Sequence, residues 1–278
     1  MLFLLLDLHC HSTFSDGTKN PAEIVKIAKE KNLEYLSLTD HDNTRGIKIA
    51  HEEAKKSGIN FVTGVEISCE YPTMLDMLGY GMNIYDEKFH DTLEKLLKYR
   101  EDRNILMIDK FKTLDIDINI EEVQKEAGSK VIGRPHFARV LVKKGYVNNK
   151  DEAFDKYLGD GKKAYMPKKR LTPEEAIDLI KNAGGYPVLA HPKYINLKSK
   201  DFIKLVKKLK NIGLSGIEVF YSKHSKGEIE FFKQVAIEND LLMTSGSDFH
   251  GENKPDISLG MSVEDKYLEK TINTLFKS

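Results

Sequence analysis

Short apolar segments and helical segments alternate along the first quarter of the chain. Residues 2–6 are all apolar, residues 33–38 and 60–65 are largely so, and stretches with helical periodicity lie between them, up to about residue 31 and over residues 45–57. An apolar run without polar alternation is typical of a strand that is buried on both faces. Alternating strands and helices are typical of a parallel sheet covered by helices. The sequence therefore predicts an α/β fold.

The alternation stops after residue 85 and resumes after residue 170. The block between them is helical in pattern, rich in charge and poor in strand signal. Strand segments return at residues 186–190, 216–221 and 241–244. We therefore predict that residues 1–85 and 171–278 form one α/β domain, and that residues 86–170 form a helical insertion that contributes substrate contacts.

Ionisable side chains follow nearly every apolar segment. His9 and His11 follow the first one, and they point to the same side because side chains on a strand alternate. Similar groups follow later segments: His41, Glu66, His191, Asp248 and His250. In α/β barrels the carboxyl ends of the strands meet at one mouth, where active sites lie. Mixed imidazole and carboxylate ligands suit Zn, Mn or Fe, so the pattern predicts a site for several ions; the alternative is a set of buried polar residues that holds loops together.

Composition indicates where in the cell the protein is expected, but it does not indicate what the protein binds. Lysine plus arginine and aspartate plus glutamate both number 43 in 278 residues, so the net charge of zero indicates no particular partner. No stretch approaches the length of a transmembrane helix, and the apolar run at residues 2–6 is too short for a signal peptide. We expect a cytoplasmic protein with no membrane contact and no obligate protein partner.

Five ordered motifs resemble those of the PHP (polymerase and histidinol phosphatase) family. They are His9-Cys10-His11, Thr39-Asp40-His41, Gly64-Val65-Glu66, Ala190-His191-Pro192 and Ser247-Asp248-Phe249-His250. The resemblance covers nearly the whole chain and implies a metal-dependent phosphoesterase on a distorted (β/α)7 TIM-like barrel, which residues 1–85 and 171–278 would form. It also implies two to three divalent metal ions, of Mn, Fe or Zn.

One segment of the insertion narrows the resemblance. Residues 133–139, Gly-Arg-Pro-His-Phe-Ala-Arg, are similar to a subgroup of 3′,5′-nucleoside bisphosphate phosphatases, which are also described as 5′-to-3′ exonucleases on short RNA. The similarity implies hydrolysis of a 3′,5′-nucleoside bisphosphate to a nucleoside 5′-monophosphate, and of short 5′-phosphorylated RNA. Two alternatives stay open: a histidinol-phosphate phosphatase, and an inactive metal-bound module that supports a protein partner.

The resemblance assigns nine metal ligands. The first ion would be held by His9, His11, Glu66 and Asp248, the second by Glu66, His191 and Asp76, and the third by Asp16, His41 and His250. Glu66 would bridge two ions and is therefore also a catalytic candidate, while Asp40 and Asp42 would orient imidazole ligands from behind. Position 76 departs from the family, which usually has histidine there. An aspartate is a harder donor that favours Mn over Zn, unless Asp76 has only a surface role.

Substrate contacts are expected in the insertion. Pro135 suits the first turn of a helix, and a helix N-terminus with Arg134 beside it can bind phosphate. We assign Arg134 and His136 to the substrate phosphate as catalytic residues, and His136 also to protonation of the leaving oxygen; the alternative is a helix-capping pair. Residues 143–170 carry nine basic and four acidic side chains, and Lys168 is the substrate contact expected from this run.

Overall fold

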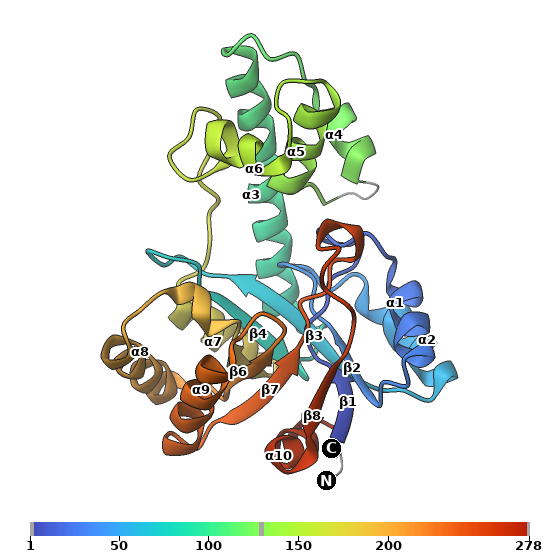
Figure 1. The fold of residues 1–278 in the computed structure, drawn as a ribbon, viewed down its shortest axis with the longest axis vertical. Coiled ribbons are helices and arrows are strands. Elements are labelled where there is room, and N and C mark those ends of the chain that lie inside the picture. Colours follow the sequence, from blue (N-terminus) through green and yellow to red (C-terminus); the bar gives the residue numbers. More distant parts are fainter. Residues whose placement is uncertain (1–2, 128–130, 277–278) are drawn as a thin grey trace.

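Eight strands form a single sheet that curves into a nearly closed barrel (Figure 1). The computed structural model describes residues 3–127 and 131–276, so Leu2, expected in the first strand, lies outside the described residues. The strands lie in the order β7-β6-β5-β4-β3-β2-β1-β8. Their bounds are β1 (Phe3–Asp7), β2 (Tyr35–Leu38), β3 (Asn60–Ser68), β4 (Asp76–Tyr80), β5 (Tyr186–Leu189), β6 (Gly216–Tyr221), β7 (Leu242–Gly246) and β8 (Met261–Glu264).

The barrel closes where the chain continues beyond β1 and β7. The backbone N–H of Leu8 donates to the carbonyl of Ser245 at 2.9 Å, and that of His11 donates to the carbonyl of Phe249 at 2.9 Å. The two segments approach so closely that a Cβ atom at Gly246 would lie 2.2 Å from Cβ of His9, so only glycine fits there. The barrel predicted from the sequence is confirmed.

β4 is the distortion in this barrel. It runs antiparallel to both β3 and β5, whereas β1, β2 and β3 are parallel neighbours. The first residue of β4, Asp76, pairs with Ser68 at the end of β3. An antiparallel strand begins where its parallel neighbours end, so the start of β4 lies at the barrel mouth.

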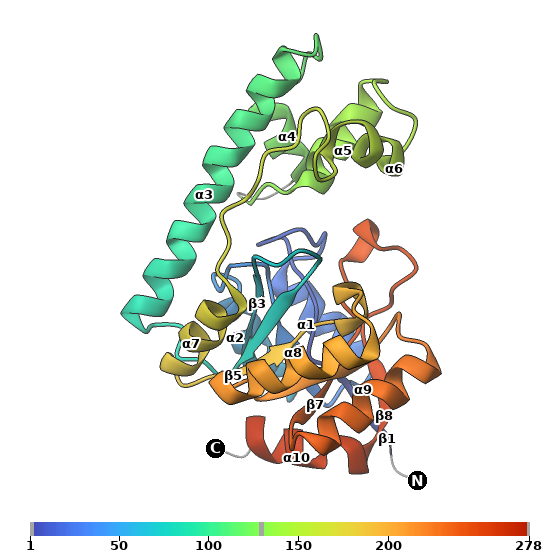
Figure 2. The same ribbon diagram turned by 90° about the vertical axis from the view of Figure 1, so that its left-hand side faces the viewer.

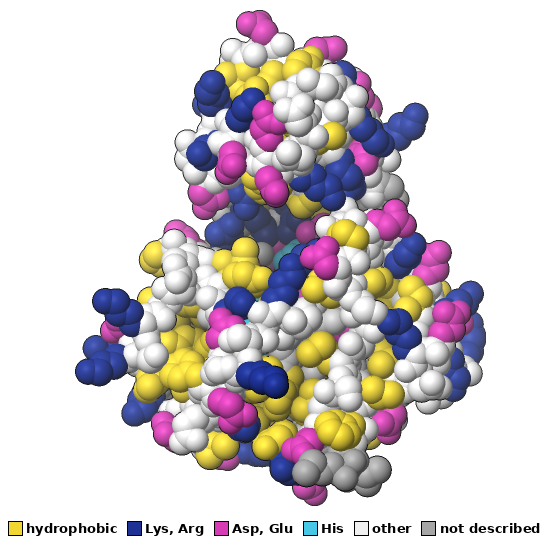
Figure 3. All heavy atoms as spheres, viewed as in Figure 1, with side chains coloured by type: hydrophobic (Ala, Val, Ile, Leu, Met, Phe, Trp, Pro, Cys, Tyr) yellow, Lys and Arg dark blue, Asp and Glu magenta, His cyan; other side chains and the backbone are white. Residues whose placement is uncertain are grey.

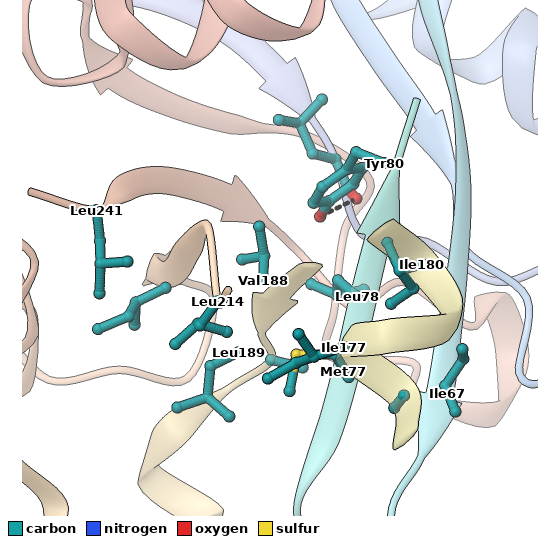
Figure 4. Packing of buried hydrophobic residues seen from close by; sticks show 14 of the residues in the cluster. Ile67, Met77, Leu78, Tyr80, Ile177, Ile180, Val188, Leu189, Leu214 and Leu241 are labelled. Carbon is teal, nitrogen blue, oxygen red and sulfur yellow. Dashed lines mark hydrogen bonds between the residues drawn. The ribbon is translucent and has the colours of Figure 1, made fainter. Parts of the chain in front are cut away.

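Helices cover the outside of the barrel (Figures 1 and 2). They are α1 (Pro21–Glu30), α2 (Ile47–Ser57), α7 (Pro173–Asn182), α8 (Ser199–Ile212), α9 (Lys226–Glu238) and α10 (Asp265–Leu275), with the short 3-10 helices η2 (Pro192–Ile195) and η3 (Gly251–Asn253). Figure 4 shows Ile177 of α7 beside Met77 of β4, both fully buried. Burying each such side chain stabilises the fold by about 1.5–3 kcal/mol.

The described part of residues 86–170 carries helices and no strand, as the sequence predicts. It comprises α3 (Glu87–Lys112), α4 (Ile120–Ala127), α5 (Arg134–Lys143), α6 (Lys150–Ala153) and the π-helical turn η1 (Phe154–Leu158). The long helix α3 rises from the barrel and carries the others above the mouth (Figure 2). Phe111, Phe137 and Leu158 belong to an apolar cluster separate from that of the barrel. This separate core supports our proposal that the insertion is a domain of its own. No helix in the described ranges is both long and apolar enough to cross a membrane.

Candidate metal centre

The barrel mouth brings together all nine side chains that the sequence assigns to metal. They come from six strands and one loop: His9 and His11 after β1, Asp16 in the loop beyond them, His41 after β2, Glu66 in β3, Asp76 at the start of β4, His191 after β5, and Asp248 and His250 after β7. The loop turns tightly at Gly17, where a Cβ atom would lie 2.1 Å from the carbonyl oxygen of His11. A glycine at this position therefore allows Asp16 to return to the histidines.

Glu66 lies in the middle of the cluster. Its Oε1 is 2.8 Å from Nε2 of His191. Its Oε2 is 3.0 Å from Nδ1 of His41, 3.2 Å from Nε2 of His11 and 3.3 Å from Nε2 of His9. Burial acts to raise the pKa of this carboxyl, but the imidazoles of His41 and His9 hold it well below its usual value. Its two oxygens face different histidines, as a bridging ligand requires.

Asp16 forms a second group with three histidines. Its Oδ1 lies 3.2 Å from Nε2 of His250, and 3.9 Å from both Nε2 of His41 and Nδ1 of His11. Burial acts to raise the pKa of the carboxyl, but His250 and His41 hold it well below its usual value. Nε2 of His11 faces Glu66 instead, so this ring lies between the two groups.

Asp76 belongs to a third group, with Glu66 and His191. Its Oδ2 is 3.7 Å from Nε2 of His191, and the residue is only 8% exposed. A surface role for Asp76 is therefore inconsistent with the structure. Its coordination of an ion stays a prediction.

Asp248 is held by contacts on both of its oxygens. Oδ1 lies 3.3 Å from Nδ1 of His250 and 3.4 Å from Nε2 of His11. Oδ2 accepts a hydrogen bond from the Tyr221 hydroxyl at 2.9 Å and pairs with Nζ of Lys254 at 2.5 Å. The backbone of Asp248 has a φ of 60°, a left-handed conformation that costs a non-glycine residue on the order of 1–3 kcal/mol. These contacts aim Oδ1 at the histidines.

Three buried atoms of the cluster have no hydrogen-bond partner among the described residues. They are Oδ1 of Asp16, Nδ1 of His41 and Oε2 of Glu66. Leaving a buried polar atom unpaired costs about 1–3 kcal/mol, so such atoms call for another partner. Each of the three residues belongs to a group with the spacing of metal ligands. Imidazole nitrogens and carboxylate oxygens suit divalent ions such as Mn, Fe and Zn, so these residues fit a metal centre.

A cavity of about 590 Å³ opens beside the cluster, and basic side chains line it. Figure 3 shows blue side chains gathered in the hollow between the insertion and the barrel, next to a cyan histidine. We call this cavity the arginine pocket; its cations are Arg100, Arg103, Arg134, Lys168 and Arg170. Asp16, His41 and Asp76 of the metal-ligand cluster lie on its wall.

The charge of the arginine pocket is only partly balanced. Asp42 pairs with Arg100 at 3.0 Å and also with Lys168, and Asp160 pairs with Arg134 at 3.0 Å. The buried Nε atoms of Arg100, Arg103 and Arg170 have no partner among the described residues. Burial and then the neighbouring Arg100 lower the pKa of Arg103 to about 9. A pocket of this kind favours an anion.

The PHP domain family model matches residues 7–276 of this chain. The chain belongs to the PHP domain family. A 5′-3′ exoribonuclease of Haemophilus influenzae is 36% identical over 251 residues, which cover 88% of this chain and 89% of that protein. A 3′,5′-nucleoside bisphosphate phosphatase of Chromobacterium violaceum is 32% identical over 256 residues, covering 91% of this chain and 90% of the relative. A solved structure from Bifidobacterium adolescentis, provisionally classed as a metal-dependent phosphoesterase, has a TM-score of 0.85 and 29% identity over 97% of this chain and 94% of its own.

Asp40 and Asp42, on either side of His41, make no direct hydrogen bond to an imidazole among the described residues. Asp40 accepts hydrogen bonds from the hydroxyls of Ser12 and Ser15, each at 2.6 Å, and the Ser15 hydroxyl also lies 3.4 Å from Nδ1 of His11. Asp42 binds Arg100 and Lys168 of the arginine pocket instead. The orienting role stays a prediction for Asp40, through Ser15, and has no support for Asp42.

Glu218 orients two of the candidate ligands; its place at a strand end made it a candidate contact in the sequence, with no firm role assigned. Its Oε1 lies 2.9 Å from Nδ1 of His9, and its Oε2 accepts the backbone N–H of His191 at 2.7 Å. The side chain is fully buried in β6. The available signal was a single carboxylate in an otherwise apolar strand, Gly-Ile-Glu-Val-Phe-Tyr.

The structure separates the three substrate residues that the sequence groups together. Arg134 lines the arginine pocket, and Lys168 lies there paired with Asp42; burial and then Arg100 lower the pKa of Lys168 to about 8. His136 is buried, and its Nδ1 accepts the backbone N–H of Gly133 at 3.0 Å, so it caps its own helix. Burial and then Arg139 lower the pKa of His136 to about 4. A neutral capping imidazole gives no support to the assigned proton donation, and all three substrate roles stay predictions.

Proposed function

We propose that this metal-dependent phosphoesterase of the PHP family removes the 3′-phosphoryl ester from nucleotides that also carry a 5′-phosphate. Its substrates are then nucleoside 3′,5′-bisphosphates and the first linkage of short 5′-phosphorylated RNA. The observation that carries this proposal is the arginine pocket, which shares a wall with the metal-ligand cluster. One phosphate lies at the cluster while the other lies among the guanidinium groups.

The similar proteins support this substrate class. One is named for 3′,5′-nucleoside bisphosphates and another for 5′-3′ exoribonuclease activity, and both are similar to this chain over about nine tenths of its length. Both substrates carry a 5′-phosphate and lose the ester at the 3′ position. The same bond, P–O3′, is broken in both, and water supplies the new oxygen on phosphorus and the proton on O3′.

The same pocket argues against histidinol phosphate as the substrate. That molecule carries one phosphate and a positively charged amine. With the phosphate at the cluster, the amine would face the guanidinium groups of the arginine pocket, and like charges brought together in a buried site are strongly unfavourable. A second phosphate in the same position would be attracted.

Residues of this chain hold the substrate and the ligand geometry. Metal ions bound by the cluster would lower the pKa of a water molecule and offset negative charge on the phosphoryl oxygens. Glu218 fixes the His9 ring, and Tyr221 and Lys254 fix Asp248, so the donors are positioned before substrate arrives. Arg103 and Arg170 hold the 5′-phosphate through charge-assisted hydrogen bonds, which excludes nucleotides without it.

A pair of substrates that differ by one phosphate tests the proposal. Wild type should hydrolyse a nucleoside 3′,5′-bisphosphate with a higher kcat/KM than the matching nucleoside 3′-monophosphate. Arg103→Met should reduce kcat/KM for the bisphosphate by about 10- to 100-fold, the worth of a charge-assisted contact, and spare the monophosphate. Arg45→Met removes an exposed arginine on the barrel side and serves as the control. Equal loss on both substrates, or no loss on either, would contradict the proposed 5′-phosphate site.

A further inference from the structure

A second cavity of about 490 Å³ opens on another side of the metal-ligand cluster. It shares six wall residues with the arginine pocket: Asp16, His41, Met74, Asp76, Pro135 and Phe154. His191, Asp248 and His250 of the cluster line only this second cavity. The cluster therefore lies between two cavities, and a substrate held at it can extend into both.

One wall of the second cavity is aromatic and apolar. Tyr194 and Tyr221 meet edge to face with ring centroids 6.0 Å apart, and Tyr194 packs against the His191 ring at 5.5 Å. Phe154 and Met74 face the same space from the insertion and from the β3–β4 turn, and Met74 is 55% exposed. Tyr194 is half-buried, whereas Tyr221 behind it is only 2% exposed, so Tyr194 is the ring of this pair that a ligand can reach. An accessible aromatic face stacks with nucleobases without regard to sequence, for about 1–3 kcal/mol per base.

Two lysines at the edge of this cavity have no acidic partner. Lys150 begins α6 of the insertion, and Lys223 follows β6 of the barrel. Neither forms an ion pair within the described chain, whereas Lys143, Lys144 and Lys156 of the run at residues 143–170 each pair with a glutamate. Unpaired lysines beside an aromatic wall form the combination that binds single-stranded nucleic acid.

We propose that this second cavity binds the nucleotide that follows the scissile phosphate in single-stranded RNA. The proposal rests on the proposed function and adds the direction in which the chain leaves the site. A 3′,5′-bisphosphate needs only the arginine pocket and the metal-ligand cluster. In RNA a further nucleoside is attached to the same phosphorus, so it must extend away from the arginine pocket. The base stacks in the cavity near Tyr194, and the next phosphates lie at Lys150 and Lys223.

This arrangement predicts repeated cleavage. Hydrolysis of the P–O3′ bond releases a nucleoside 5′-monophosphate and leaves the phosphate on the shortened chain as a new 5′ end. That end has the group which the arginine pocket accepts, so the chain can move forward by one nucleotide. The second cavity keeps the remaining strand bound between cleavages.

The experiment compares two substrates and two double variants. Lys150→Ala/Lys223→Ala removes both unpaired lysines of the cavity, and Lys162→Ala/Lys163→Ala removes two exposed lysines of the insertion that line neither cavity. Steady-state kinetics are measured with a nucleoside 3′,5′-bisphosphate and with a 5′-phosphorylated trinucleotide. The ratio of kcat/KM for the trinucleotide to that for the bisphosphate should fall about tenfold in the first variant and stay at the wild-type value in the control. The slope of log affinity against log salt for the trinucleotide should become shallower by about 1.4, since each released contact contributes about 0.7.

The outcomes separate the two proposals. An unchanged ratio in the Lys150/Lys223 variant, or an equal fall in the control, would overturn the RNA cavity and leave the bisphosphate activity in place. A wild-type protein that hydrolyses the bisphosphate but not the trinucleotide would also overturn it. Hydrolysis of neither substrate by the metal-loaded protein would overturn the proposed function, and the RNA cavity with it.

Discussion

The metal-ligand cluster and the arginine pocket share a wall but are built in opposite ways. In the cluster, carboxylates and imidazoles lie within 4 Å of one another, so each charge has a neighbour of opposite sign. In the pocket, burial and then the neighbouring Arg100 lower the pKa of Arg103, and Arg170 makes no ion pair among the described residues. The cluster is a set of donors that fits cations, and the pocket is a set of cations that fits an anion.

The difference also lies in what holds the two sites in place. The donors follow strands, and their backbone positions are set by the sheet. The cations come from one face of α3, from the start of α5 and from the segment before α7. A site at strand ends is rigid, whereas the pocket depends on how the insertion sits above the barrel. Mutations in the two sites should therefore affect different steps.

The largest effect is expected in the cluster. Glu66→Gln should lower kcat by more than about a thousandfold, because metal ions supply several kcal/mol of transition-state stabilisation and Glu66 contacts four histidines. The metal content, measured by elemental analysis, should fall together with activity. Glu94→Gln, on the exposed face of α3, is the matched control. Full metal content and rate in Glu66→Gln would refute the bridging assignment.

The arginine pocket should show a smaller and different effect. Arg134→Ala should reduce kcat/KM by about a hundredfold through loss of roughly 3 kcal/mol of charge-assisted contact, and the metal content should stay the same. Asp160→Asn leaves the arginine in place and removes its only carboxylate partner among the described residues, so it should retain activity. Loss of metal from Arg134→Ala would mean that the two sites are not independent.

The meeting of the nine candidate ligands could be predicted from the sequence because strand ends leave a local signature. His9 and His11 follow an apolar run, and Glu66 and His191 do the same, so the meeting point follows from the barrel geometry alone. The family prediction and the barrel prediction were confirmed for this reason. The reversed direction of β4 has no such signature, because an apolar strand has the same pattern in either direction.

The arginine pocket could be predicted only in part. Arg134 could be assigned because it lies at the predicted start of a helix. Arg100 and Arg103 lie on a helix so rich in charged residues that the sequence predicts an ordinary solvent-exposed surface. Their spacing of three residues places them on one helix face, which is the one local sign available. Their approach to Arg170 depends on packing between segments about seventy residues apart. The role of Glu218 could not be assigned from the sequence for a similar reason, since its partners His9 and His191 are distant in the chain.

Removing a residue that orients a metal ligand should weaken metal binding less than removing the ligand itself. Glu218→Gln should weaken metal binding by about 10- to 100-fold, the usual effect of losing a carboxylate behind a ligand histidine. Metal titration followed by activity measures the shift, and excess metal should restore most of the rate. Glu264→Gln, a glutamate of β8 outside the cluster, is the control. A rate that excess metal does not restore would mean that Glu218 acts on the substrate itself.

Asp76 tests the position where this chain departs from its family. Asp76→Ala should lower the metal content by about one equivalent, while the group of Asp16, His41 and His250 keeps its ion. Asp76→His should shift the preference from Mn toward Zn, because imidazole is a softer donor. Metal content and activity with Mn, Mg and Zn are compared across the wild type and both variants. Three indistinguishable profiles would place Asp76 outside the coordination sphere.

The smallest effect is expected on stability, through His136. This residue follows the pocket residues Arg134 and Pro135 in the chain, but its side chain caps a helix. Its folded-state pKa of about 4 is below the ordinary 6.5, because burial and then Arg139 disfavour the imidazolium. Between these two pH values the unfolded chain binds one more proton than the folded protein. Through this group the wild type therefore loses stability as the pH falls through that window, by about 1.4 kcal/mol per pH unit.

His136→Asn keeps an acceptor for the N–H of Gly133 and has no titrating ring. The stability of this variant relative to wild type should therefore rise by about 1.4 kcal/mol for each pH unit below about 6, since only the wild type carries the linked proton. Urea unfolding of both proteins at several pH values between 7 and 5 measures the difference, and comparing variant with wild type cancels the other titrating groups. A difference that does not change with pH would show that folding leaves the pKa of His136 unaltered, and a difference that shrinks as the pH falls would show that the folded protein holds the imidazole protonated, as a proton donor to the leaving oxygen requires. The capping role would then be only part of what this histidine does, and the arginine pocket would extend to it.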